Sequence, residues 1–242
     1  MDGARAEHPL LDFAPETCGR LMDFLRDNDV SYQSLKRQAE ERRRAFRWSG
    51  EGKNMRPLGS FEPSRFDDTF VGNFRRAGVY KKVPTRTTAK YEYWLDERGR
   101  LTAALRYNTE EYWKDRLGAY SYETYRAAET EDLTIYITFQ ATDKGKERSI
   151  VYGYRYAGDT LAEKAELTYV GKVMTNMDCQ LYTYGTDQAL VSAEDYHMTG
   201  PGLYESRIAK AIGFPGSMPY SLLSYRGVTY MVAHGFTPKP GL

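Results

Sequence analysis

The sequence predicts an α+β protein in which N-terminal helices pack on a curved, mostly antiparallel β-meander or partly closed barrel. Apolar and polar residues alternate repeatedly between residues 90 and 198, and a period of two is typical of β-strands. Short turns that contain Gly or Asp separate the alternating runs, which favours consecutive hairpins. Residues 16–48 instead show apolar spacings of three and four, which indicate helices.

Two helices are predicted before the strands. Leu21, Phe24 and Leu25 repeat at helical spacing, and a second helix is expected over residues 31–48. The second helix has a narrow apolar stripe and an otherwise strongly charged surface. Shorter helices are expected over 64–78 and 109–117.

The clearest strand occupies residues 133–142. Apolar side chains take every second position there: Leu133, Ile135, Ile137, Phe139 and Ala141. We expect the first four to face the core. The residues between them, Thr134, Thr138 and Gln140, are expected to face solvent or a polar cavity.

Hairpin turns are predicted where Gly can supply a positive φ. The turn at 96–99 joins the runs 91–95 and 101–107, and the turn at 143–145 follows the strand at 133–142. Further runs follow at 161–169, 181–184 and 189–193, and a last hairpin is expected over 221–233. By composition, residues 1–80 form a helical, basic segment and residues 81–242 a β-rich region, expected together to form one compact unit.

The net charge of +1 argues against a uniformly basic nucleic-acid binder. It conceals an asymmetry, because residues 36–86 contain fourteen Lys and Arg but only six Asp and Glu. Such a division suggests either a surface with two charged regions or an internal contact between them.

The number of cysteines and the length of the apolar runs indicate the cellular compartment of the protein. Cys18 and Cys179 are the two cysteines, fewer than a secreted disulfide scaffold normally has, so we expect both to be reduced. We find no apolar run long enough for a membrane span. A cytoplasmic protein without membrane contact is therefore expected.

Basic residues beside aromatic ones form the strongest candidate binding site. The residues are Arg42, Arg43, Arg44, Arg47 and Trp48. They suit an acidic protein partner, or the phosphates and bases of single-stranded nucleic acid. The structural alternative is a solvated helix face.

Tyrosines suggest a second candidate site. Tyr152, Tyr154 and Tyr156 alternate along one predicted strand and would line the cup of a curved sheet. The structural alternative is simple packing, because tyrosine fits a half-buried sheet well.

Familiar catalytic and metal-binding patterns are missing from the sequence. It has no phosphate-binding loop, dinucleotide fingerprint or nucleophile elbow, and His8, His197 and His234 lack the spacing of metal ligands. We therefore expect no cofactor and no metal. Whether the chain is an enzyme stays open, with no catalysis the favoured interpretation. Carboxylates such as Glu92, Glu123 and Glu163 could act as acid–base groups only if the fold brought them together.

One hairpin carries a family resemblance. The stretch Asp96-Glu97-Arg98-Gly99-Arg100-Leu101-Thr102, with Tyr93 before it, resembles the YD repeat of Rhs-type polymorphic toxins. It is also similar to the Tyr-rich hairpins of proteins from toxin and immunity loci in bacteria. The resemblance covers this one hairpin and implies no functional residue.

Three functions remain as hypotheses. The leading one is non-enzymatic binding of a macromolecule, in its most concrete form as an immunity or inhibitor protein of a bacterial toxin system. The second is a small-ligand-binding cup or an enzyme with a Tyr-lined pocket. The third is single-stranded nucleic-acid binding through the basic helix.

Overall fold

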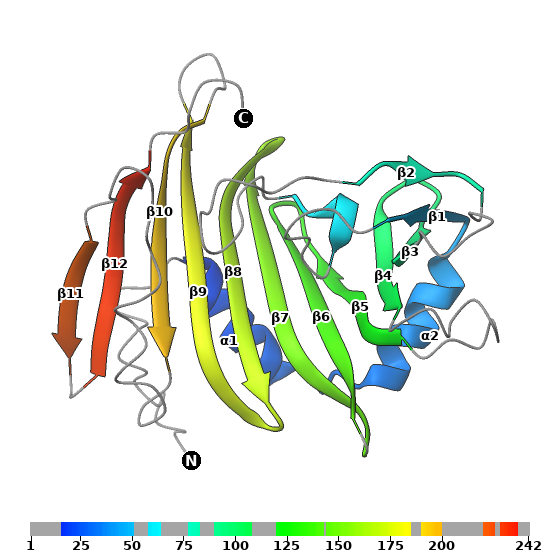
Figure 1. Ribbon diagram of the computed structural model, residues 1–242, viewed down its shortest axis with the longest axis horizontal. Coiled ribbons are helices and arrows are strands. Elements are labelled where there is room, and N and C mark those ends of the chain that lie inside the picture. The colour runs from blue at the N-terminus through cyan, green and yellow to red at the C-terminus, as the bar shows by residue number, and fades with distance from the viewer. Residues whose placement is uncertain are drawn as a thin grey trace. The chain divides into compact units, whose positions relative to one another are not determined.

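The computed structural model describes residues 16–50, 58–63, 77–82, 90–107, 120–142, 144–184, 190–199, 220–225 and 228–236. It confirms the α+β class with antiparallel strand pairing and strands that curve along their length (Figure 1). The chain divides into two compact units. We call residues 29–151 the central unit, and residues 1–28 with 152–242 the terminal unit. The boundary that composition suggests near residue 80 stays a prediction.

The central unit contains one α-helix beside an antiparallel sheet. Its elements are α2 (Tyr32–Arg42), β1 (Ala45–Ser49), the 3-10 turn η2 (Gly59–Phe61), β2 (Val79–Tyr80), β3 (Tyr91–Leu95), β4 (Leu101–Tyr107), β5 (Tyr120–Glu129) and β6 (Leu133–Thr142). The strand order is β6-β5-β4-β3-β1-β2. Strand β2 is an end of the sheet, and β6 has β7 (Gly145–Ala157) as its other neighbour. The described strands therefore form an open meander rather than a partly closed barrel.

The terminal unit has the same design of one helix and an antiparallel sheet. Its elements are α1 (Glu16–Asp27), β8 (Thr160–Val170), β9 (Val173–Tyr184), β10 (Leu190–Thr199), β11 (Tyr220–Tyr225) and β12 (Val228–Phe236). The strands run in the order β11-β12-β10-β9-β8-β7, and β11 is an end of the sheet. The strand β7 (Gly145–Ala157) contains the point where the chain passes from the central to the terminal unit.

Strand β6 follows the alternation in its sequence. Its predicted core side chains are buried: Leu133, Ile135, Ile137 and Phe139. Gln140 is exposed, and Thr134 is half-buried. Thr138 is buried, and its hydroxyl lies 2.8 Å from the hydroxyl of Thr124 on β5. The core assignment is confirmed, and the polar face contains a hydroxyl pair.

The second helix is shorter than the sequence suggests. It ends at Arg42, Arg43 already has an extended backbone with ψ 125°, and β1 begins at Ala45. The expected continuation to Trp48 is therefore wrong. Residues 45–49 pair with β3, where Phe46 lies opposite Trp94, and aromatic side chains favour such a pleated, half-buried surface.

The β3–β4 hairpin forms where it was predicted. Gly99 has φ 74°, a value that L-residues other than Gly rarely adopt. Asp96 stabilises the turn, because its Oδ1 accepts hydrogen bonds from the backbone N–H groups of Arg98 (3.0 Å) and Arg100 (2.9 Å). Burial acts to raise the pKa of Asp96, but hydrogen bonds from Arg126 and Arg100 outweigh it and hold the pKa below its usual range.

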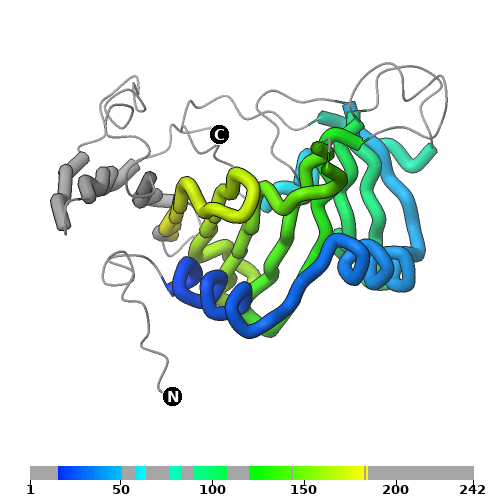
Figure 2. Tube along the Cα trace, turned by 90° about the horizontal axis from the view of Figure 1, so that it is seen from below, coloured from blue at the N-terminus to red at the C-terminus, as the bar shows by residue number. Residues whose placement is uncertain are grey.

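Helix α1 lies beside the strands of its own unit (Figure 2). Three links join it to these strands. Thr17 donates from its backbone N–H (3.0 Å) and its hydroxyl (2.5 Å) to Glu163 Oε2 on β8. Gly153 on β7 lies directly under the helix, because a Cβ there would come within 2.9 Å of Thr17 Cγ2. The third link is a disulfide between Cys18 and Cys179 on β9.

That disulfide contradicts the expectation of two reduced cysteines. The two residues are 161 positions apart in sequence, and α1 brings them together by running beside β8 and β9. Disulfides persist mainly in oxidising compartments, so the cytoplasmic location stays a prediction.

Several predictions concern residues outside the described ranges. The short helices predicted at 64–78 and 109–117 and His8 lie mainly or wholly outside the described ranges. None of the described helices combines the length and the apolar character needed to cross a membrane.

Candidate functional site

The arginines predicted as a binding site are distributed over the end of α2 and strand β1. Arg42 is the last residue of α2 and is exposed, as is Arg44. Arg44 donates to the carbonyls of Glu41 (2.8 Å) and Arg43 (3.0 Å), and Arg47 donates to the carbonyl of Phe46 (2.7 Å). The alternation of β1 places Arg47 on the face opposite to Phe46 and Trp48.

Arg43 lies against aromatic rings. Its guanidinium carbon is 4.6 Å from the ring centroids of both Phe46 and Trp94. Phe46 also stacks on Trp48, with centroids 5.8 Å apart and ring planes 13° from parallel. A cation over an aromatic face is attracted by the ring quadrupole, so these rings hold Arg43 in place.

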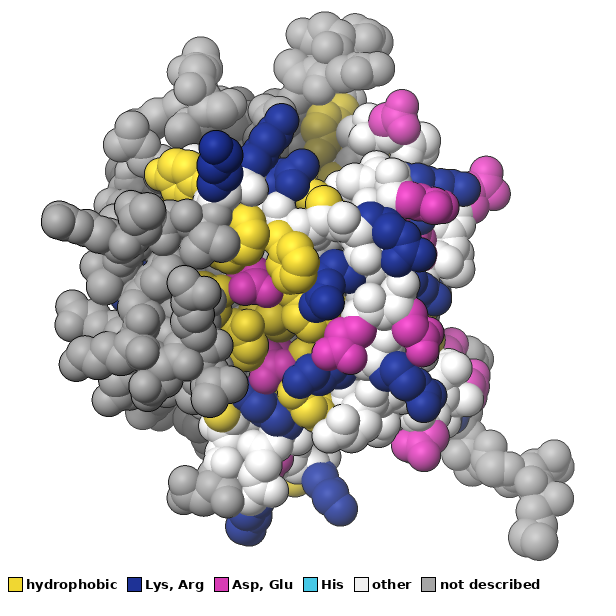
Figure 3. Space-filling model, turned by 90° about the vertical axis from the view of Figure 1, so that its right-hand side faces the viewer, with side chains coloured by type: hydrophobic (Ala, Val, Ile, Leu, Met, Phe, Trp, Pro, Cys, Tyr) yellow, Lys and Arg dark blue, Asp and Glu magenta, His cyan; other side chains and the backbone are white. Residues whose placement is uncertain are grey.

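Strand β2 extends this aromatic group. Tyr80 pairs with Trp48 in the register of β1 and β2, and paired residues on neighbouring strands share a face. Phe46 and Tyr80 are 37% and 49% exposed. We call Arg43, Phe46, Trp48 and Tyr80 the aromatic–arginine surface. Figure 3 views the side of the molecule where β1, β2 and α2 lie, and it shows hydrophobic side chains gathered among charged ones.

This surface is cationic. In the part of the chain that the structure describes, Arg42, Arg43, Arg44 and Arg47 form no ion pair with a carboxylate. A guanidinium that stacks by its face keeps its N–H donors in the plane of the group, directed away from the rings. Arg43 can therefore stack on aromatic rings and bind a carboxylate at the same time.

The tyrosines predicted as a second site lie on β7. Tyr152 and Tyr154 are fully buried and stack with their centroids 6.2 Å apart, while Tyr156 is half-buried. The buried ammonium of Lys164 on β8 lies 5.6 Å from the ring centroid of Tyr152 and 6.0 Å from that of Tyr154. The structure thus brings two of the three tyrosines together, around a lysine that the sequence did not single out.

Two buried carboxylates of the central unit, Glu92 and Glu123, each accept hydrogen bonds from several donors. Glu92 accepts from Trp94 Nε1 (2.7 Å) and from the Tyr107 hydroxyl (2.6 Å). Such saturation by hydrogen bonds satisfies a buried charge and is typical of a structural group.

Glu123 is the centre of a larger network. It accepts hydrogen bonds from the hydroxyls of Tyr32 (2.9 Å) and Tyr125 and forms an ion pair with Lys146 (2.9 Å). Burial, and then the nearby Glu123 carboxylate, raise the pKa of Tyr32 and Tyr125 above their usual range. Both tyrosines therefore remain neutral donors, and the network links α2 to β5.

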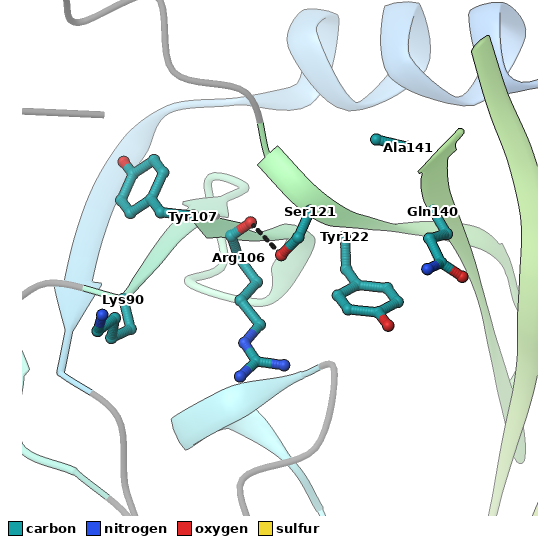
Figure 4. Close-up of a pocket in the computed structure, with 7 residues that line it drawn as sticks. All are labelled: Lys90, Arg106, Tyr107, Ser121, Tyr122, Gln140 and Ala141. Carbon is teal, nitrogen blue, oxygen red and sulfur yellow. Dashed lines mark hydrogen bonds between the residues drawn. The ribbon is translucent and has the colours of Figure 1, made fainter. Parts of the chain in front are cut away.

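The central unit also contains an open pocket of about 510 Å³ that the sequence did not indicate (Figure 4). Its lining residues are Lys90, Arg106, Tyr107, Ser121, Tyr122, Gln140 and Ala141. The side chains of Arg106, Tyr122 and Gln140 extend to the same side of the strands in Figure 4, whereas the ring of Tyr107 extends to the other side. We call this cavity the Arg106 pocket.

The register explains why these residues meet. Arg106 on β4 pairs with Tyr122 on β5, and Tyr122 pairs with Gln140 on β6. The guanidinium carbon of Arg106 lies 5.9 Å from the ring centroid of Tyr122. In the sequence each residue is one polar position in an alternating run, and the pairing of the strands could not be read from it.

Within the described residues, no group of three or more His, Cys, Asp and Glu side chains could hold a metal ion. Comparison of the chain with protein-family models, with curated proteins and with solved structures finds no match.

Proposed function

We propose that this protein is a non-enzymatic binding protein that takes an acidic protein partner on its aromatic–arginine surface. The observation that carries the proposal is Arg43, whose guanidinium carbon lies over the Phe46 and Trp94 rings, 4.6 Å from each centroid. The exposed Tyr80 pairs with Trp48 on the neighbouring strand. Binding hot spots are enriched in Trp, Tyr and Arg, because these side chains combine large contact area with directed hydrogen bonds.

Charge supports an acidic partner. Residues 36–86 carry a large excess of Lys and Arg, and Arg43 forms no ion pair with a carboxylate among the described residues. A carboxylate that meets a preorganised guanidinium gains a charge-assisted, often bidentate hydrogen bond. The stacking fixes Arg43 before binding, which lowers the entropy lost when the complex forms.

The most concrete form of this proposal is an immunity or inhibitor protein of a bacterial toxin system. It is supported by the resemblance of the hairpin from Asp96 to Thr102 to YD repeats. In that form the acidic partner is a toxin domain.

Site-directed photo-crosslinking tests the proposal in the cells that make the protein. A benzophenone amino acid replaces Phe46 in one variant and Tyr80 in a second. A third variant carries it at Val173, which is 60% exposed at the start of β9 and serves as the control. We expect the first two variants to capture the same protein, and we expect that protein to have a net negative charge.

Binding measurements with the purified partner then show whether it is held by electrostatic attraction or was crosslinked only because it happened to be nearby. Its affinity should fall as salt rises from 50 to 300 mM, because exposed charges are screened. Capture of a basic protein, of a second copy of this chain, or of the same species at Val173 would contradict the proposal. Capture of single-stranded nucleic acid at Phe46 would replace it with the nucleic-acid hypothesis.

A further inference from the structure

We propose that the Arg106 pocket binds a small hydroxylated organic anion, of the class of sugar phosphates and sugar acids. This site is separate from the aromatic–arginine surface and does not depend on it. The inference starts from the pocket itself, whose volume of about 510 Å³ lies within the usual range of small-molecule sites.

Two cationic side chains define the charge of the ligand. Lys90 and Arg106 both line the pocket. Phosphate and carboxylate groups match the geometry of a guanidinium, which can donate two parallel hydrogen bonds to them. A lysine ammonium nearby adds a second positive charge.

Uncharged polar groups define the rest of the ligand. The Tyr122 and Gln140 side chains extend to the same side of the strands as Arg106. A phenol hydroxyl and an amide can each both donate and accept, as the hydroxyl groups of a sugar do. An apolar anion would leave these groups without partners, at a cost in affinity.

The strands hold these groups in fixed positions. Arg106, Tyr122 and Gln140 are successive register partners on β4, β5 and β6, and the Arg106 guanidinium lies against the Tyr122 ring. Ser121 Oγ also donates to the Arg106 carbonyl at 3.3 Å (Figure 4). Sites built on paired strands are better ordered than sites on loops, so little rearrangement is needed for binding.

Calorimetric titration of the full chain tests this inference. The probes are glucose 6-phosphate, glucuronate, glucose and inorganic phosphate. We expect one of the two sugar anions to bind at least roughly tenfold more tightly than glucose, which cannot form the charged hydrogen bonds. The same anion should bind at least roughly tenfold more tightly than inorganic phosphate, which lacks the hydroxyl groups that Tyr122 and Gln140 would bind. The comparison of glucose 6-phosphate with glucuronate distinguishes a phosphate ligand from a carboxylate ligand.

Matched variants locate the binding. Arg106→Gln removes the charge from the pocket, and Arg98→Gln removes the same charge from an exposed position in the β3–β4 turn. We expect roughly tenfold or more weakening in Arg106→Gln and unchanged affinity in Arg98→Gln. Tyr122→Phe should lower the affinity for the sugar anion but leave the affinity for inorganic phosphate unchanged.

Three results would overturn the inference. They are failure of both sugar anions to bind, equal affinity of glucose or inorganic phosphate, and unchanged binding in Arg106→Gln. If Arg106→Gln does not fold, as judged by circular dichroism, Lys90→Gln takes its place with the same expected loss.

Discussion

Ile137 has no exposed surface and pairs with Tyr125 in the middle of the central unit. We predict that Ile137→Asp unfolds the protein, because an unpaired buried charge costs several kcal/mol against a total stability of about 5–15 kcal/mol. Val173→Asp is the matched control, since Val173 is exposed. Thermal melting checks both variants, and an unchanged melting temperature in Ile137→Asp would show that β6 is wrongly placed.

Glu163 is the buried carboxylate that binds the first turn of α1 through Thr17. Burial acts to raise its pKa, but hydrogen bonds from Arg155 and Thr17 outweigh burial and hold the pKa of Glu163 below its usual range. A carboxyl group with a lowered folded-state pKa stabilises the protein fully above its unfolded-state pKa of about 4.3. That stabilisation is lost as the pH falls through the folded-state pKa.

We therefore predict that Glu163→Gln lowers the free energy of unfolding at pH 7 and that its difference from wild type shrinks below about pH 4. Urea unfolding at pH 7, 5 and 3.5 measures this difference. Glu16→Gln removes an exposed ion pair with Arg20 and should change stability little at any of these pH values. A Glu163→Gln difference that is constant with pH would rule out the charge as the cause.

At the level of elements, α1 approaches β7 closely because Gly153 has no side chain. A Cβ at this position would lie 2.9 Å from Thr17 Cγ2 and 3.0 Å from Leu21 Cδ2. The helix would have to move away from the strand to accommodate it, and the bonds from Thr17 to Glu163 would lengthen.

We predict that Gly153→Ala destabilises the protein by about 1–3 kcal/mol, the usual cost of overpacking a tight contact. Gly78→Ala is the control, because a Cβ at Gly78 would be 3.9 Å from its nearest neighbour, the Tyr80 hydroxyl. Chemical unfolding compares the two variants. Equal stability of both would mean that α1 does not lie on Gly153.

The elements that could be predicted from the sequence are those whose signals are local. The β3–β4 hairpin follows from Asp96 and Gly99, and the buried face of β6 follows from strict alternation. The end of α2 was misjudged because the charged residues of 36–44 suit a helix, while the pairing of β1 with β3 depends on a segment more than forty residues away. The Arg106 pocket was missed for the same reason, since register is a property of paired strands.

At the level of the whole molecule, the disulfide between Cys18 and Cys179 closes a loop of 161 residues. A cross-link over a long loop restricts the unfolded chain, which typically contributes about 2–5 kcal/mol. The disulfide could not be predicted from local sequence, because neither cysteine belongs to a spaced motif.

We predict that the purified protein, alkylated under denaturing conditions without reductant, takes up no label. After reduction it should take up two labels per chain, and its melting temperature should fall. Mass spectrometry and a thermal melt check these outcomes. Two labels without reductant would restore the expectation of free thiols.

Both proposed sites belong to the central unit. The aromatic–arginine surface lies at β1 and β2, and the Arg106 pocket lies at β4 to β6. Cationic side chains contribute to each and give both sites a preference for negative charge. Arg43 belongs to the Lys- and Arg-rich stretch 36–86, whereas Lys90 and Arg106 follow it in the sequence.

The central claim is that Arg43, held against the Phe46 and Trp94 rings, binds an acidic partner. Its most direct test is the dissociation constant of the crosslinked partner with Arg43→Gln and with Arg98→Gln, two exchanges of the same kind in the central unit. We predict weakening of roughly tenfold or more for Arg43→Gln and wild-type affinity for Arg98→Gln. Equal affinity of the two variants would contradict the claim.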